Sequence, residues 1–310
     1  MIYIADENDE GKRLDYYLTE VIVSDADNNG RISRSKVQKL IKDGGVKVNG
    51  ESRKPSYILR ENDKISSEDF IAEEVKILPE NIPIETVYED ENMLVVNKPS
   101  GMLTHPTTIE KSGTLVNALL FKFEDNLSDI NGEFRRGILH RLDRNTSGLL
   151  MIAKTNAAHE FLAEQIKNHT IVKKYRAIVK GAWEKDEEVL DFPIGRNPKQ
   201  PHKMAVLPDG KPSQTEVRVI RRFKDATAVE LNLITGRTHQ IRVHTSYMHH
   251  PVYNDTLYGA GRGKVNTQEQ VLQSFYLRFT KPFSDEIIDV EIPPDEKYSK
   301  VLKYLEDNDK

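Results

Sequence analysis

The sequence predicts an α+β protein whose larger part is built on a mixed, largely antiparallel sheet. Segments with strand and helix patterns alternate irregularly and do not repeat as strand, helix, strand, which argues against a doubly wound parallel sheet. The chain has 310 residues, enough for two domains and a sizeable core. We expect a small α+β domain over residues 1–67, an acidic linker over 68–84 and a second domain over 85–304.

The distribution of charge separates the first domain from the linker. Residues 31–54 hold eight Lys or Arg and two acids, whereas residues 61–91 hold eleven acids and two Lys. The net charge of the whole chain is −4, so it indicates no preference for nucleic acid. A basic block beside an acidic one indicates a local anion-binding face, although two solvated faces would give the same pattern.

The first domain is predicted to contain two helices and short strands. Apolar residues repeat on one face of a helix over residues 11–23, and Ser33 is placed to cap a second helix that ends at Gly44. Strands are predicted over Val46–Val48 and Ile58–Ile65. The outward face of the second helix carries four cations that we expect to contact phosphates: Arg34, Lys36, Lys39 and Lys42.

The second domain is predicted to consist mainly of strands. Asn156 is placed to cap a helix whose apolar face turns inward. Short apolar runs predict the strands Met93–Val96, Ile138–His140, Leu149–Ala153, Lys173–Val179, Val217–Ile220 and Ala228–Ile234. Strands that follow one another with few intervening helices favour antiparallel pairing.

The string from His140 to Leu150 is the strongest indication of chemistry. It places Asp143 between Arg141 and Arg144, in a polar stretch between two predicted strands. Nearby positive charge favours the ionised form of a carboxylate, which can act as a nucleophile or as an electrostatic stabiliser. A surface loop with an ion pair would hold the same few charges, so the interpretation depends on the whole string.

That string resembles the catalytic motif of the RluA-type pseudouridine synthases. Three further segments match the same family in order, and the resemblance spans about residues 85–295: Val95–Pro106, Lys173–Tyr175 and Leu233–His244. Residues 33–50 resemble the basic helix and turn of an S4 RNA-binding domain, a resemblance that covers about residues 11–65. Together they imply a pseudouridine synthase fold preceded by an S4 domain.

The resemblance implies isomerisation of uridine to pseudouridine in RNA. The base is detached from C1′, turned and rejoined through C5, which requires it to be extruded into a pocket. By resemblance Asp143 is the catalytic aspartate, Tyr175 lies on the uracil and Arg237 pairs with Asp143. Whether Asp143 attacks the nucleotide or acts on an intermediate stays open. The remaining candidate RNA contacts are Lys98, Arg141, Arg144 and Arg242.

Neither a cofactor nor a metal is expected, because every covalent step takes place within one nucleotide. The spacing of His239, His244 and His249 is not that of helical metal ligands. The pair Asn254-Asp255 stands where the family has Gly-Asp, a departure that bears on substrate choice. Two rival functions remain: a non-catalytic RNA-binding or ribosome-assembly factor, and a hydrolase with an aspartate nucleophile.

The expected partner is RNA, with ribosomal large-subunit RNA preferred over transfer RNA because family members with an S4 domain act mostly there. The chain has no cysteine, which fits a reducing compartment, and no window approaches the ~20 apolar residues of a membrane helix. We therefore expect a cytoplasmic monomer that does not bind membranes.

Overall fold

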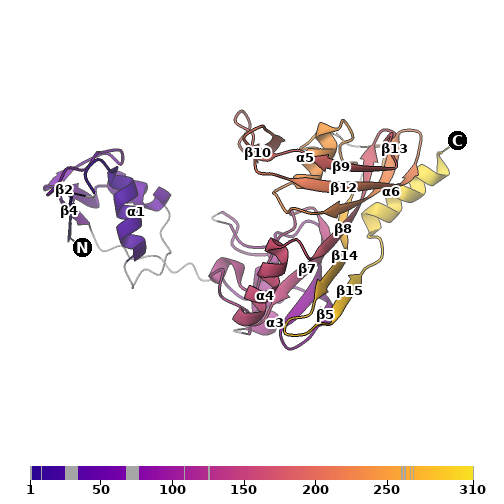
Figure 1. Cartoon of the computed structure of the whole chain (residues 1–310), viewed down its shortest axis with the longest axis horizontal. Helices are drawn as coiled ribbons and strands as arrows, with labels where there is room; N and C mark the ends of the chain where they lie inside the picture. The colour runs from indigo at the N-terminus through magenta and orange to yellow at the C-terminus, as the bar shows by residue number, and fades with distance from the viewer. Residues whose placement is uncertain are drawn as a thin grey trace. The chain divides into compact units, whose positions relative to one another are not determined.

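The chain forms two compact units in this computed structural model, residues 1–75 and 76–310 (Figure 1). The structure describes residues 2–7, 9–24, 34–67, 77–107, 109–124, 126–259, 261, 263–265, 267 and 269–309. The predicted cap Ser33, the side chain of Lys36 and the linker residues 68–76 lie outside this part of the chain. Each unit has its own buried apolar core.

The smaller unit packs two helices on a four-stranded antiparallel sheet of order β1-β4-β2-β3. Val37 and Ile41 of the second helix are buried against Leu14 and Leu18 of the first, as their helical spacing predicts. The elements are β1 (Ile2–Ile4), α1 (Leu14–Ser24), α2 (Arg34–Lys42), β2 (Val46–Val48), β3 (Glu51–Ser52) and β4 (Lys64–Ser67).

The predicted strand over Ile58–Ile65 is wrong for most of its length. Only residues from Lys64 onward pair within the sheet. Ile58 instead makes an isolated bridge with Arg13, and the Leu59 amide donates to the Lys12 carbonyl. The apolar residues of this segment therefore support the start of α1 and do not lengthen the sheet.

The larger unit is built on a nine-stranded mixed sheet (Figure 1). Neighbouring strands are antiparallel except for one parallel pair, β7 and β14, which confirms the predicted α+β class. In spatial order the strands are β5 (Glu85–Glu89), β6 (Met93–Lys98), β7 (Ser147–Ala153), β14 (Leu272–Thr280), β8 (Val172–Lys180), β13 (Ala226–Leu233), β12 (Gln214–Arg222) and β9 (Glu187–Asp191), with β15 (Ile287–Glu291) beside β14.

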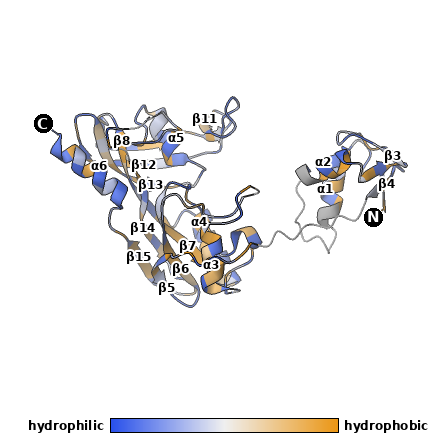
Figure 2. Ribbon diagram, turned by 180° about the vertical axis from the view of Figure 1, so that it is seen from behind, coloured by the Kyte–Doolittle hydropathy of each residue, from blue (hydrophilic) through white to orange (hydrophobic). Residues whose placement is uncertain are grey.

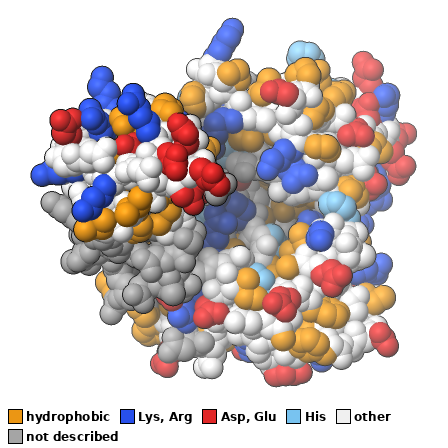
Figure 3. All heavy atoms as spheres, turned by 60° about the vertical axis from the view of Figure 1, so that its left-hand side comes forward, with side chains coloured by type: hydrophobic (Ala, Val, Ile, Leu, Met, Phe, Trp, Pro, Cys, Tyr) orange, Lys and Arg blue, Asp and Glu red, His pale blue; other side chains and the backbone are white. Residues whose placement is uncertain are grey.

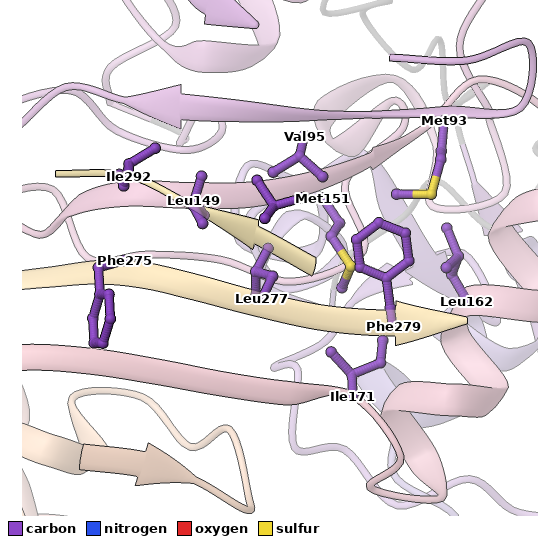
Figure 4. Close-up of a cluster of buried hydrophobic side chains, with 11 residues drawn as sticks. Met93, Val95, Leu149, Met151, Leu162, Ile171, Phe275, Leu277, Phe279 and Ile292 are labelled. Atoms are coloured by element: carbon purple, nitrogen blue, oxygen red, sulfur yellow. The ribbon is translucent and has the colours of Figure 1, made fainter. Parts of the chain in front are cut away.

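Helices and a small hairpin surround this sheet. Apolar residues gather on β6, β7 and α3 (Figure 2). Side chains of β6, β7, β14 and α4 meet in one buried cluster, which includes Met151, Leu162, Leu277 and Phe279 (Figure 4). The elements are α3 (Leu115–Phe123), η1 (Glu133–Arg135), α4 (Asn156–Lys167), the hairpin β10 (Ile194–Arg196) and β11 (Met204–Val206), α5 (Gln240–Tyr247) and α6 (Glu296–Asp307).

Two predictions of local structure in this unit are wrong. Residues 138–140 do not form a strand: Ile138 makes one isolated bridge with Ile152, and the His140 ring nitrogen Nε2 accepts from the Met151 amide at 3.0 Å. The cap of α4 is Thr155, whose hydroxyl accepts from the Ala158 amide at 3.1 Å. A hydroxyl one residue earlier in the chain takes the capping role that the sequence suggested for Asn156.

Candidate active site

Asp143 lies on the loop that leads into β7, held on both sides by backbone contacts. Leu142 is buried, and both its amide and its carbonyl bond to the Thr104 hydroxyl, at 3.3 and 2.9 Å. On the other side the Asp143 carbonyl accepts from the Thr146 amide at 3.1 Å. These bonds fix the backbone of the loop, so the carboxylate can be aimed by its own side-chain partners.

Arg242 is the cation that holds this carboxylate. Its Nη1 donates to Asp143 Oδ2 at 3.0 Å, while its Nε and Nη2 bond to Asp255 at 2.6 and 3.0 Å. The guanidinium also lies over the Tyr258 ring, 5.1 Å from its centroid. Burial alone would lower the pKa of Arg242, but the hydrogen bonds to Asp255 and the charges of both carboxylates raise it. Arg242 is therefore a fixed positive charge.

The predicted pairing of Arg237 with Asp143 is wrong. Arg237 is exposed, and its Nε donates to the Pro212 carbonyl at 3.1 Å. It precedes α5, whereas Arg242 lies in the first turn of that helix and faces inward. Arg242 lines the cavity, but its side chain is only 8% exposed and is shared by two carboxylates, so its predicted contact with RNA stays a prediction.

Asp255 and His239 belong to the site and were not predicted as functional. Asp255 is buried and fixes Arg242 through two hydrogen bonds. His239 places Nε2 3.9 Å from Asp143 Oδ1, while its Nδ1 bonds to the Tyr258 hydroxyl at 2.8 Å. Desolvation lowers the pKa of His239. The sequence signal for Asp255 is its place in the Asn254-Asp255 pair, which by itself indicates only an effect on substrate choice.

Tyr175 lies on β8 opposite Ser274 of β14 and is buried. Burial raises the pKa of Tyr175 to about 12, and the negative charge of Asp143 adds to the rise. The phenol therefore stays protonated at any working pH. It can pack against a ring or donate a hydrogen bond, but it cannot take up a proton.

A cavity of about 490 Å³ opens beside Asp143. Pockets of this size hold small organic molecules. On the face shown in Figure 3 the larger unit is hollowed near its middle, and Lys, Arg and His side chains lie in and around the hollow. The cavity is lined by Leu103, Arg141, Asp143, Arg144, Asn145, His239, Arg242, Asn254, Asp255, Thr256, Leu257, Glu269 and Gln270.

Of the other residues predicted to contact RNA in this unit, Arg141 and Arg144 lie at the surface and Lys98 lies in the core. Arg141 and Arg144 are exposed at the cavity, although Arg144 pairs with Glu110. Lys98 is fully buried, and its ammonium donates to the carbonyls of Pro99, Met102 and Arg144 at 2.8, 2.8 and 3.1 Å. The prediction that Lys98 contacts RNA is therefore wrong: all three N–H groups support the backbone around Asp143.

In the smaller unit Arg34 also has a structural partner. It bonds to the buried Asp15 carboxylate at 2.9 and 3.1 Å, and Gln38 donates to the same oxygen at 2.6 Å. Arg34 thereby joins α1 to α2. Lys39 and Lys42 are exposed. Acidic and basic side chains both appear on the face of this unit seen in Figure 3.

The described residues offer neither a metal site nor a membrane span. They contain no group of three or more His, Cys, Asp or Glu side chains arranged to hold a metal ion. Within the same ranges, none of the helices has the length and apolar character needed to cross a membrane.

Comparison with known proteins gives two family matches. Residues 92–247 match the model of the RNA pseudouridylate synthases, and residues 30–65 match that of the S4 domain. The chain is 40% identical to an RNA pseudouridine synthase of Bacillus subtilis, over 98% of this chain and 97% of that one. It is 38% identical to the ribosomal large subunit pseudouridine synthase D of Zymomonas mobilis, over 92% of each chain.

A solved structure shares the fold. Human RNA pseudouridylate synthase domain containing 1 superposes with a TM-score of 0.56 at 26% identity, covering 72% of this chain and 95% of the human one. The 72% of this chain that superposes is close to the fraction of the chain that forms the larger unit, residues 76–310.

Proposed function

Because the chain belongs to the RNA pseudouridylate synthase family and isomerises uridine in RNA, we propose that Asp143 carries the reaction on a nucleotide flipped into the cavity beside it. The observation that carries this proposal is the pairing of Asp143 Oδ2 with the buried Arg242 at 3.0 Å. A buried arginine held by a second carboxylate fixes the direction of the Asp143 carboxylate.

The geometry leaves one carboxylate oxygen for the substrate. Oδ2 of Asp143 accepts from Arg242, whereas Oδ1 lies 3.9 Å from the His239 ring nitrogen Nε2. The side chain is 18% exposed at the cavity. Oδ1 is thus the atom that meets the sugar or the base, as nucleophile or as base, once the uridine has left the RNA stack.

Tyr175 then acts by contact and not by proton uptake. Burial raises the pKa of the Tyr175 phenol to about 12, which favours the protonated form and a role for Tyr175 other than accepting the C5 proton. The aromatic ring can pack against the flipped base. Arg141 and Arg144, exposed at the cavity, are placed to meet the sugar–phosphate chain on either side of it.

The proposed substrate is ribosomal large-subunit RNA. The relative from Zymomonas mobilis is named for that RNA, and the chain has an S4 domain, a module that adds affinity for RNA. The exposed Lys39 and Lys42 of α2 would supply phosphate contacts, which add affinity without sequence information.

The test measures tritium release from RNA labelled at C5 of uridine. Large-subunit RNA and transfer RNA transcripts are each incubated with the wild-type protein, with Asp143→Asn and with Asp285→Asn, a change to an exposed acid that does not line the cavity. We expect release from large-subunit RNA that is lost in Asp143→Asn and kept in Asp285→Asn. Activity in Asp143→Asn would refute the role of Asp143. Release from transfer RNA alone would refute the substrate.

A further inference from the structure

Lys297, in the first turn of α6, points its ammonium into the core beside the active-site loop. Nζ donates to Ser100 Oγ at 2.9 Å, to the Asn145 carbonyl at 3.0 Å and to the Gln270 carbonyl at 3.2 Å. The side chain is 14% exposed. A buried ammonium is costly unless each of its N–H groups is bonded, and here three donors meet three acceptors.

Those acceptors belong to three chain segments that meet at the cavity. Asn145 and Gln270 line it, and Asn145 lies two residues after Asp143. Ser100 follows β6 and itself donates to the Asn145 carbonyl at 2.9 Å. Lys297 therefore joins the active-site loop to both neighbouring segments through one group.

The start of α6 holds the same loop at a second point. Asp295, the N-cap of the helix, accepts from the Ser147 hydroxyl at 2.5 Å. Ser147 is the first residue of β7. Together with Lys98, which holds the Arg144 carbonyl at 3.1 Å, these contacts fix the loop at residues 144, 145 and 147. The loop therefore has little freedom to move Asp143 away from Arg242.

Lys297 lies outside residues 92–247, the segment that the synthase family model covers. We propose that Lys297 is a positioning residue for catalysis, which sets the loop geometry that aims Asp143 at the flipped nucleotide. The inference rests on the proposed function of Asp143. According to this inference, α6 supports catalysis although none of its residues lines the cavity.

The test compares Lys297→Met with Lys300→Met, an exposed lysine on the same helix. Methionine keeps most of the side-chain volume and removes all three donors. The single-turnover rate of tritium release is measured at saturating protein, alongside the Kd for the RNA. We expect Lys297→Met to lower the rate about 10- to 100-fold with Kd within about twofold, because a small misplacement of a catalytic group costs rate and not affinity. Lys300→Met should match the wild type.

A second variant keeps the test decisive if Lys297→Met does not fold. Ser100→Ala removes one of the two donors to the Asn145 carbonyl and one of the three acceptors of Lys297; we expect a rate about 3- to 10-fold lower. A wild-type rate in folded Lys297→Met, or in Ser100→Ala when the first variant is unfolded, would overturn the inference. So would a loss confined to Kd.

Asp143→Asn is assayed in parallel to separate the two proposals. If Asp143→Asn is inactive and Lys297→Met has the wild-type rate, only the positioning role fails. If Asp143→Asn is active, the proposed function fails, and the role of Lys297 fails with it.

Discussion

The direction of the Asp143 carboxylate depends on one arginine that is shared with a second acid. Arg242 makes one hydrogen bond to Asp143 and two to Asp255, which has a 1% exposed side chain. Breaking a buried ion pair from one side leaves the other charge unpaired, which costs more than the pair contributes. Arg242 thus links the stability of the larger unit to the geometry of its active site.

This sharing predicts opposite outcomes for two arginines. Arg242→Gln should lower turnover at least about 100-fold and destabilise the larger unit by about 3 kcal/mol or more, because Asp255 is left charged and buried. Arg237→Gln should change stability by less than about 0.5 kcal/mol, as exposed residues do. Trp183, the single tryptophan, is buried in the larger unit, so its fluorescence during urea denaturation measures the stability of each variant. Equal stability losses in the two variants would contradict the assignment.

Tyr175 offers a separate test of proton transfer. Because its pKa is raised to about 12, Tyr175→Phe should keep turnover within about tenfold of the wild type, whereas Tyr175→Ala should lose about 100-fold or more with the ring. The pH profile of turnover should show no step near pH 10 attributable to this phenol. A Tyr175→Phe variant as inactive as Tyr175→Ala would mean that the hydroxyl itself takes part.

His140 should make the larger unit sensitive to acid. Desolvation lowers the pKa of His140 to about 3, while the unfolded chain titrates near 6.5. Between these values the unfolded state binds more protons, so stability present above pH 6.5 is lost as the pH falls toward 3, by up to about 1.4 kcal/mol for each pH step of one. His140→Gln keeps an acceptor for the Met151 amide and cannot titrate. Urea denaturation between pH 4 and 7 should show a shallower decline in that variant; parallel curves would contradict the assignment.

The sequence pointed to Asp143, which the structure shows at the cavity, but it did not identify the side chains that hold it. Asp143 stands in a contiguous string whose resemblance to a family motif singles it out. The sequence assigned Arg237, and not Arg242, as the partner of Asp143. Arg237 precedes α5 and Arg242 lies in its first turn, and the position where this helix begins was not evident from the sequence. Lys98 was misassigned for a similar reason: a lysine in a sequence gives no sign that three carbonyls enclose it.

At the scale of elements, the parallel contact of β7 with β14 positions the active-site loop. Gly148 pairs with Ser274 in this contact and has φ +115°, a conformation that side chains rarely adopt. A Cβ at this position would lie 2.0 Å from the Ser274 carbonyl oxygen. The two strands can therefore approach only because residue 148 has no side chain.

Gly148→Ala should separate these strands. We expect a loss of several kcal/mol in the stability of the larger unit, since a backbone contact must open, together with a loss of turnover. The matched control is Gly236→Ala, where an added Cβ meets nothing within 4 Å; it should unfold like the wild type. The Trp183 unfolding curve checks both, and a wild-type curve for Gly148→Ala would refute the close approach.

Strands with long apolar runs were predictable, and elements defined by distant partners were not. β6, β7, β8 and β13 follow directly from their apolar residues. α5 has only eight residues, and most of them are buried, including the polar Gln240 and Arg242. Its sequence therefore lacks the separate apolar and polar faces by which a helix is predicted. Ile138 and its neighbours have strand composition but find only one bridging partner, because pairing depends on what tertiary structure places alongside.

The whole molecule combines a unit of the RNA pseudouridylate synthase family with an S4 domain. On α2, Arg34 is bound to Asp15, while Lys39 and Lys42 are exposed. Lys39 and Lys42 are therefore the cations of this helix that we expect to contact phosphates. Such binding releases counterions and makes affinity depend on salt concentration.

Neutralising Lys39 and Lys42 should weaken RNA binding and leave the catalytic rate unchanged. In the full chain, Lys39→Gln with Lys42→Gln should lower RNA affinity and reduce the slope of log affinity against log salt by about 1.5, because each phosphate of a single strand that a lysine neutralises adds about 0.7 to the slope. The single-turnover rate at saturating protein should stay at the wild-type value, because both lysines lie in the other unit from Asp143. Lys300→Gln with Lys303→Gln removes the same charge from the exposed side of α6 and should leave the slope unchanged. If both double variants lower the slope equally, the protein attracts RNA through its general charge, and α2 has no special role in binding.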